Sequence, residues 1–263
     1  MCLIQIIVKQ KKQRKFKKSR FFGFCKKICS LFLRPAKVVY EDESDKPKQA
    51  IFLTNHGIKP LLGIIRHELT MPKDVPFVTI GTHELCNPYF KRLKYGYTIH
   101  YRLRLGWGKI RAFFATAFIA IFLGPLYKMA RVIPSYRDVR STRTVKNATD
   151  ALNQNHSILL YPENLEHLYN NVFLEFLPGF VFLAQYYYKK TGKDIPVVPC
   201  YFSYQLNRFI MGKPMSVIEL LESGKTRAEV ADIFRIKVNN LYTKYIQPTI
   251  AEKEAKFAKY NKA

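Results

Sequence analysis

The stretch Ile51-Phe52-Leu53-Thr54-Asn55-His56-Gly57 decides the fold class of this chain. Its first four residues are large and apolar or β-branched, which is typical of a short strand buried inside a sheet. The Asn-His-Gly that follows predicts a turn. A polar turn directly after a buried strand is common in open α/β proteins, which bind ligands beyond the carboxyl ends of their parallel strands.

Similar patterns continue on both sides of this stretch. Residues 50–54 are one of six strand-like runs, and the others are 37–40, 76–80, 131–135, 157–161 and 197–204. Helical patterns cover 138–154, with Asp138 as a candidate cap, and 177–190, which a glycine follows. A capping-box pattern at Thr226 and Glu229 starts a third helix. Strands that alternate with helices predict an α/β domain with a mostly parallel central sheet flanked by helices.

The composition points to an anionic partner. The chain has 263 residues, 48% of them hydrophobic, and a formal net charge of +25 from 44 basic and 19 acidic residues. Such a charge favours anionic lipid, an acidic carrier protein, a phosphorylated ligand such as coenzyme A, or nucleic acid. No helix-turn-helix, RNA-recognition or zinc-finger pattern accompanies it in the sequence, so we expect no specific nucleic-acid partner.

The amino-terminal region has the pattern of a helix that lies on a membrane. Eleven of the lysines and arginines, and no acidic residue, fall within the first 34 residues. Apolar residues recur there at steps of three or four, at Phe21, Phe24, Ile28, Leu31 and Phe32. An aromatic face bordered by cations predicts binding to anionic lipid headgroups. The alternative is a helix that packs on the rest of the protein while its lysines face water. We therefore predict a basic amphipathic membrane-associating segment over 1–35 and one larger domain over 36–263.

A second apolar stretch, residues 112–127, contains no charged residue. It falls short of the roughly 20 residues of a helical span, and we expect Gly124-Pro125 to break it. The five cysteines are scattered, without a CxxC pair, which favours reduced thiols in a cytosolic compartment and no metal site. The protein is thus predicted to lie on the cytoplasmic face of a membrane, peripheral or half-inserted.

Four groups of residues follow predicted strands and could carry chemistry. His56 follows the first strand, where an imidazole could act as a general base near neutral pH. Arg137 lies between a strand and a helix start, where a guanidinium could hold a phosphate or form an ordinary surface ion pair with Asp138. Glu163 follows the strand at 157–161, and Pro199 lies in a short proline-flanked strand.

The order of these groups resembles the four motif blocks of the lysophosphatidic acid (1-acylglycerol-3-phosphate) acyltransferase family. Asn55-His56 matches the first block, and residues 132–137 match the second, a strand that ends in arginine. Tyr161-Pro162-Glu163 matches the third, and residues 195–199 match the fourth, an apolar strand flanked by prolines. The resemblance covers about residues 36–205.

The resemblance implies an O-acyltransferase. In that family the histidine deprotonates an acceptor hydroxyl, whose oxygen attacks the thioester of acyl-CoA or acyl-carrier protein, without a metal or another cofactor. It implies His56 as the general base and Asn55, Arg137, Glu163 and Pro199 as substrate-binding residues. The implied acceptor is a lysophospholipid or another glycerol-phosphate-like molecule, and an anionic membrane lipid is the implied surface.

Two departures mark the chain as a divergent member. The first block of the family ends in an aspartate, and Leu61 occupies that position here. Glu68 or Asp74 could supply the carboxylate instead. In the third block, Asn164 and Glu166 replace the glycine and arginine of the family pattern, so no cation follows Glu163 there. These departures leave an alternative function open, a catalytically impaired relative that binds lipid or acyl chains at the membrane.

Overall fold

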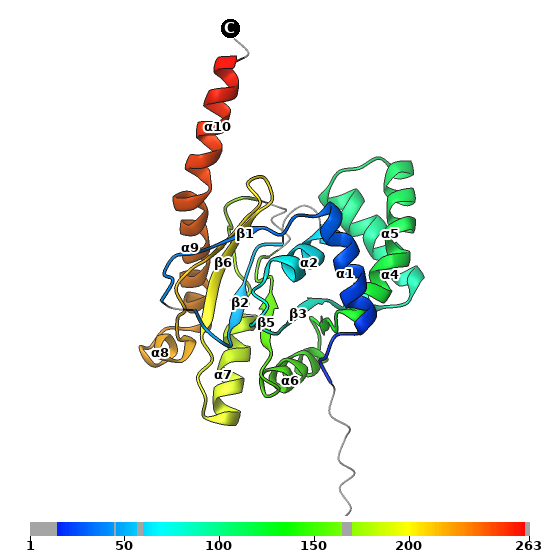
Figure 1. Ribbon diagram of the computed structural model, residues 1–263. Helices are drawn as coiled ribbons and strands as arrows, with labels where there is room; N and C mark the ends of the chain where they lie inside the picture. The colour runs from blue at the N-terminus through cyan, green and yellow to red at the C-terminus, as the bar shows by residue number, and fades with distance from the viewer. Residues whose placement is uncertain (1–14, 45, 57–59, 165–169, 261–263) are drawn as a thin grey trace, which may run out of the picture.

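The computed structural model describes residues 15–44, 46–56, 60–164 and 170–260. Within them, seven strands form one sheet: β1 (Lys37–Tyr40), β2 (Ile51–Leu53), β3 (Phe77–Thr82), β4 (Ile133–Ser135), β5 (Ser157–Leu160), β6 (Val197–Ser203) and β7 (Arg208–Met211). Their order is β1-β7-β6-β2-β5-β3-β4 (Figure 1). The five strands from β6 to β4 are parallel, while β7 runs antiparallel to β6 and pairs in parallel with β1. The predicted mostly parallel α/β sheet is confirmed.

β7 is the strand that the sequence did not predict. It follows β6 through a tight turn in which Asn207 has a φ of 50°, and it pairs with β6 from Cys200↔Met211 to Ser203↔Arg208. Its hydrogen bonds to β6 and β1, which are tertiary contacts, stabilise it as a strand.

Helices cover both faces of the sheet. In chain order they are α1 (Arg20–Phe32), α2 (Pro60–Thr70), α3 (His83–Cys86), α4 (Tyr89–Tyr95), the π-helix η1 (Gly96–Arg104), α5 (Lys109–Met129), α6 (Ser141–Leu152), α7 (Gly179–Thr191), α8 (Val217–Glu222), α9 (Arg227–Tyr245) and α10 (Gln247–Tyr260). One core lies between the sheet and α6, α7 and α9, and includes Phe180 and Phe234 with ring centroids 5.3 Å apart. A second core, on the other face, includes Phe52, Met71 and Phe202. Because β2 is buried on both faces, its sequence is a continuous apolar run.

The structure confirms two of the three helix boundaries that were predicted from the sequence, the start of α9 and the end of α7. The predicted capping box is present at α9, where Thr226 and Glu229 exchange side-chain and backbone hydrogen bonds, and Gly192 ends α7 with a φ of 69°. Asp138 does not cap α6. Its carboxylate accepts hydrogen bonds from the backbone N–H and the guanidinium of Arg140 instead.

Thr226→Ala is expected to lower the free energy of unfolding by about 1 kcal/mol, because it removes the side chain that bonds the backbone N–H of Glu229. Urea unfolding measures the change. Thr243→Ala, an exposed substitution inside the same helix, is the control and should be close to neutral. Equal effects of the two variants would contradict the assignment of the capping box.

A helical lobe stands beside the sheet and is formed by α3, α4, η1 and α5 (Figure 1). Its core is shared with α1 and α2 and includes Phe22, Ile64, Leu85 and Leu123. The expectation that Gly124-Pro125 would break the apolar helix is wrong, because α5 continues through Pro125 to Met129. A proline inside a helix removes one hydrogen-bond donor and its ring clashes with the carbonyl four residues earlier. The tertiary packing of Leu123, Leu126 and Tyr127 in the lobe offsets this cost.

The amino-terminal helix α1 packs on this lobe through Phe22, which is buried. The five apolar residues with helical spacing, which the sequence assigned to a lipid-facing side, are exposed, Phe32 by 82%. Lys18 pairs with the buried carboxylate of Glu68 in α2, and Lys26 donates to the Glu68 carbonyl at 2.8 Å. Residues 1–14 of the predicted membrane-associating segment lie outside the described part of the chain.

Candidate active site

A cavity of about 410 Å³ lies where the carboxyl ends of β3, β4 and β5 meet the helical lobe. His56, Arg137 and Glu163 line it. They come from the ends of β2, β4 and β5, so the sheet order brings together residues that are far apart in the chain. The structure thus unites three of the five residues that the sequence singled out.

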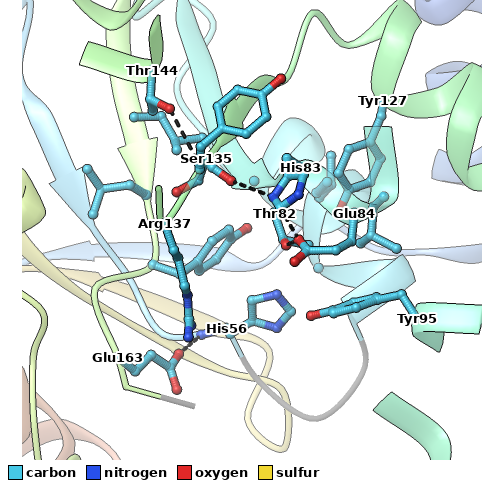
Figure 2. A pocket seen from close by; sticks show the side chains of 18 of the residues that line it. His56, Thr82, His83, Glu84, Tyr95, Tyr127, Ser135, Arg137, Thr144 and Glu163 are labelled. Atoms are coloured by element: carbon cyan, nitrogen blue, oxygen red, sulfur yellow. Dashed lines mark hydrogen bonds and ion pairs between the residues drawn. The ribbon is translucent and has the colours of Figure 1, made fainter. Parts of the chain in front are cut away.

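His56 is held to the cavity wall by its backbone and its ring. Its N–H donates to the carboxyl group of Glu163, and its carbonyl accepts from the Tyr204 hydroxyl at 3.4 Å. The imidazole ring packs against Tyr161, with centroids 4.8 Å apart. In Figure 2 the Tyr95 hydroxyl, from α4, points toward this ring. The ring therefore lies at the junction of the sheet and the helical lobe.

Glu163 is the carboxyl group that the structure brings to His56. Burial raises its pKa to about 7, although the hydrogen bond from the His56 N–H and the charge of Arg104 both act to lower it. Near neutral pH the group therefore exists in both protonation states. A carboxyl with this pKa can accept or donate a proton at physiological pH.

Arg137 extends into the cavity, and in Figure 2 its guanidinium points toward Glu163. The alternative role, an ion pair with Asp138, is not observed, because Asp138 binds the guanidinium of Arg140 at 2.6 Å. Arg137 has no hydrogen bond or ion pair with another residue that the structure describes. Its charge is available to a ligand.

The other two candidates lie outside the cavity wall. The Asn55 amide bonds the main chain of β6 twice, donating to the Phe202 carbonyl at 2.9 Å and accepting from the Phe202 N–H at 2.6 Å. It thereby joins the end of β2 to β6. Pro199 is a buried β6 residue paired with Leu53. Both contribute to the sheet that positions His56.

Neither alternative carboxylate that the sequence offered is placed to replace the motif aspartate. Glu68 accepts from Lys18, and burial raises its pKa. Asp74 is exposed before β3, at the amino ends of the parallel strands, whereas His56 follows the carboxyl end of β2. Leu61 lies in α2, and its side chain falls outside the described part, as do residues 165–169 of the third block.

Three histidines near this centre were not predicted from the sequence: His67, His83 and His100, of which His100 is buried and lines the cavity. His67 in α2 is fully buried, with Nδ1 2.7 Å from the Gly63 carbonyl and Nε2 3.3 Å from the Thr54 hydroxyl. Burial lowers its pKa to about 4, so it is neutral and supports the end of β2. No sequence signal distinguishes it from an ordinary core histidine.

His83 begins α3 directly after β3 and also lines the cavity. Its Nδ1 lies 3.2 Å from both the Ser135 carbonyl and the Glu84 carboxyl group, and Figure 2 shows the three together. Ligands bind at the carboxyl ends of parallel strands, and the strand before His83 and Glu84 was predicted. This rule could therefore have identified His83 and Glu84 as candidate site residues.

Residues 106–203 match the family model described as acyltransferase. Over this stretch the chain is similar to the acyltransferase family. The match confirms an acyltransferase resemblance for this part of the chain and contains Arg137, Glu163 and Pro199, while His56 precedes the matched segment. It also contains α5 and the strands β4 to β6.

Among curated proteins, none matches the sequence. Among solved structures, the chain is similar to the 1-acyl-sn-glycerophosphate (LPA) acyltransferase PlsC from Thermotoga maritima. The identity is 13% over 86% of this chain and 90% of that chain, with a TM-score of 0.42.

Proposed function

We propose that the protein is an O-acyltransferase that moves a fatty acyl group from a thioester to the hydroxyl of a lysophospholipid or a glycerol-phosphate-like acceptor. One observation carries the proposal. The cavity that the acyltransferase segment lines with Arg137 and Glu163 also contains His56, which the Glu163 carboxyl holds by its backbone N–H. A base, a cation and a carboxyl in one cavity are the groups that such a transfer uses.

In the proposed reaction His56 takes the proton of the acceptor hydroxyl. The oxygen then attacks the thioester carbonyl of acyl-CoA or acyl-carrier protein, a C–O bond forms and the C–S bond breaks. The proton passes from His56 to the departing thiolate. Arg137 binds the phosphate of the acceptor, and Glu163 orients both the His56 backbone and the glycerol part. The acyl donor and the acceptor are the two substrates consumed, and the products are the ester and the free thiol.

The cavity also offers an apolar region for an acyl chain. Ile64 of α2, Leu85 of α3, and Ile119 and Leu123 of α5 line the side toward the helical lobe. A volume of about 410 Å³ lies within the range of small-molecule sites, roughly 300–1,000 Å³. An acyl chain seated there would present its thioester carbonyl toward His56.

The helical lobe also supports a membrane location. α5 has 21 residues and is, by length and composition alone, apolar enough to cross a membrane, but six of its residues are buried inside the protein. Ile119 and Leu123 on one side line the cavity, while Phe114 and Phe118 on another side are 68% and 65% exposed. The same helix could therefore contact lipid and guide it to the site. We propose that α1 and α5 rest in the cytoplasmic leaflet of a membrane, without crossing it.

Phe122 of α5 is exposed as Phe118 is. The double variant Phe118→Gln/Phe122→Gln is expected to weaken binding to phosphatidylglycerol-containing vesicles at least about tenfold. The reason is that burying one phenylalanine side chain is worth about 1.5–3 kcal/mol. Vesicle co-sedimentation measures the loss. Ile236→Gln, which changes an exposed apolar residue of α9, is the control and should bind as the wild type does. Unchanged binding of the double variant would remove α5 from the lipid contact.

The direct test of the proposed function is transfer itself. Purified protein is incubated with radiolabelled acyl-CoA or acyl-carrier protein and a set of lysophospholipids, and labelled diacyl product is measured. Product formation is the expected result. Tight binding of acyl donor or lysolipid without any product would instead favour the alternative of an impaired relative, which Leu61 in the first block motivates. In that case Leu61→Asp is the variant in which to look for regained turnover.

A further inference from the structure

We propose that Arg104, on the π-helix η1, is a second phosphate-binding residue and acts with Arg137 to hold the acceptor's phosphate. The inference rests on the proposed function and names a specificity-determining residue for it. Arg104 lies outside the four motif blocks, and the sequence offered no cation after Glu163 in the third block. In the structure, Arg104 of the helical lobe is a cation that lines the cavity in addition to Arg137.

The position of Arg104 is the first support. Its side chain is half-buried and lines the same cavity as His56, Arg137 and Glu163. Its charge reaches the centre of the site, where it acts to lower the pKa of both Glu163 and His100. Like that of Arg137, the guanidinium of Arg104 has no hydrogen bond or ion pair with another described residue. Two guanidiniums that face one cavity without such partners are available to an anion.

Local structure holds Arg104 in this place. η1 is a π-helix of nine residues, a rare element that is often found at functional sites. Its end is closed by the Trp107 N–H, which donates to the Tyr101 carbonyl at 2.9 Å, and by Arg102, which donates to the Trp107 carbonyl at 2.6 Å. The Tyr101 and Trp107 rings lie 4.8 Å apart. Arg102 therefore has a structural role, and Arg104, two residues later, lines the cavity.

The charge of the cavity agrees with an anionic ligand. Its described lining contains three arginines, Arg92, Arg104 and Arg137, against the two glutamates Glu84 and Glu163. Arg92 is engaged by main-chain carbonyls, including that of Ala120 at 3.0 Å. The raised pKa of Glu163 leaves part of its population neutral near pH 7. The guanidiniums of Arg104 and Arg137 would therefore attract a bound phosphate monoester, with little repulsion from the glutamates of the cavity.

The test compares acceptors with and without phosphate. For Arg104→Gln we expect the KM for 1-acylglycerol-3-phosphate to rise at least tenfold, while the KM values for 1-acylglycerol and for the acyl donor stay unchanged. Arg104→Lys, which keeps the charge but loses the planar guanidinium, should recover part of the loss. Arg143→Gln removes an exposed arginine of α6 that does not line the cavity and should behave as the wild type.

A binding measurement separates this inference from the proposed function. Trp107, the only tryptophan in the chain, contacts Tyr101 of the cavity wall, so its fluorescence reports ligand binding even if no transfer occurs. We expect Arg104→Gln to lose the preference of the wild type for 1-acylglycerol-3-phosphate over 1-acylglycerol in detergent micelles. An unchanged preference overturns the inference. A rise confined to the KM for acyl-CoA and absent with acyl-carrier protein also overturns it, because Arg104 would then serve the donor's nucleotide phosphates.

Discussion

Replacing His56 with alanine is expected to lower kcat for acyl transfer roughly 10²- to 10⁴-fold, the usual contribution of a general base. The proton of the acceptor hydroxyl would then have no acceptor at the junction of β2, β5 and the helical lobe. The binding of acyl donor and acceptor should change little, because Arg137, Glu163 and the apolar lining remain. Initial rates at saturating substrates, measured with labelled acyl-CoA, give the change.

The matched control for this variant is His156→Ala. His156 lies between α6 and β5, outside the cavity lining, with Nδ1 2.9 Å from the Gln154 carbonyl. It should keep the wild-type kcat. Thermal unfolding of both variants separates a loss of chemistry from a loss of fold. Full activity of His56→Ala would remove His56 from the mechanism and leave Glu163 as the candidate base.

The second large effect concerns the stability that Glu163 contributes as a function of pH. The ordinary pKa of the carboxyl is 4.5, and burial raises it to about 7 in the folded protein. Below pH 4.5 the Glu163 carboxyl is protonated in both the folded and the unfolded protein. Between pH 4.5 and 7 it is protonated mainly in the folded protein. The stability gained from the protonated carboxyl is therefore complete in acid and lost as the pH rises through 7.

Glu163→Gln should remove this dependence, because glutamine cannot ionise. We expect the free energy of unfolding of the wild type, relative to the variant, to fall by about 2–3 kcal/mol between pH 5 and pH 8. Urea unfolding of both proteins at several pH values gives the difference, in which other titrating groups cancel. Glu219→Gln, an exposed change in the first turn of α8, should track the wild type. Parallel curves for wild type and Glu163→Gln would show that the carboxyl titrates normally.

Local patterns explain how much of this fold could be predicted. The strand β1 and the capping box of α9 come from residues that are adjacent or three apart, so their signals are complete within a few positions. β7 and η1 were not predicted, because β7 depends on its hydrogen bonds to β6 and β1 and a nine-residue π-helix has no periodic signal of its own. The continuation of α5 through Pro125 likewise depends on contacts within the helical lobe.

The sequence by itself determined the α/β class, the succession of its principal strands and the positions of His56, Arg137 and Glu163 at strand ends, because each of these is encoded by neighbouring residues. Only the tertiary structure decided that Glu163 binds the backbone of His56, 107 residues away, that Asn55 joins β2 to β6, and that Arg104 faces the same cavity. The physical reason is that the order of strands in the sheet and the packing of the helical lobe bring distant residues together, and no local pattern records which distant residues will meet.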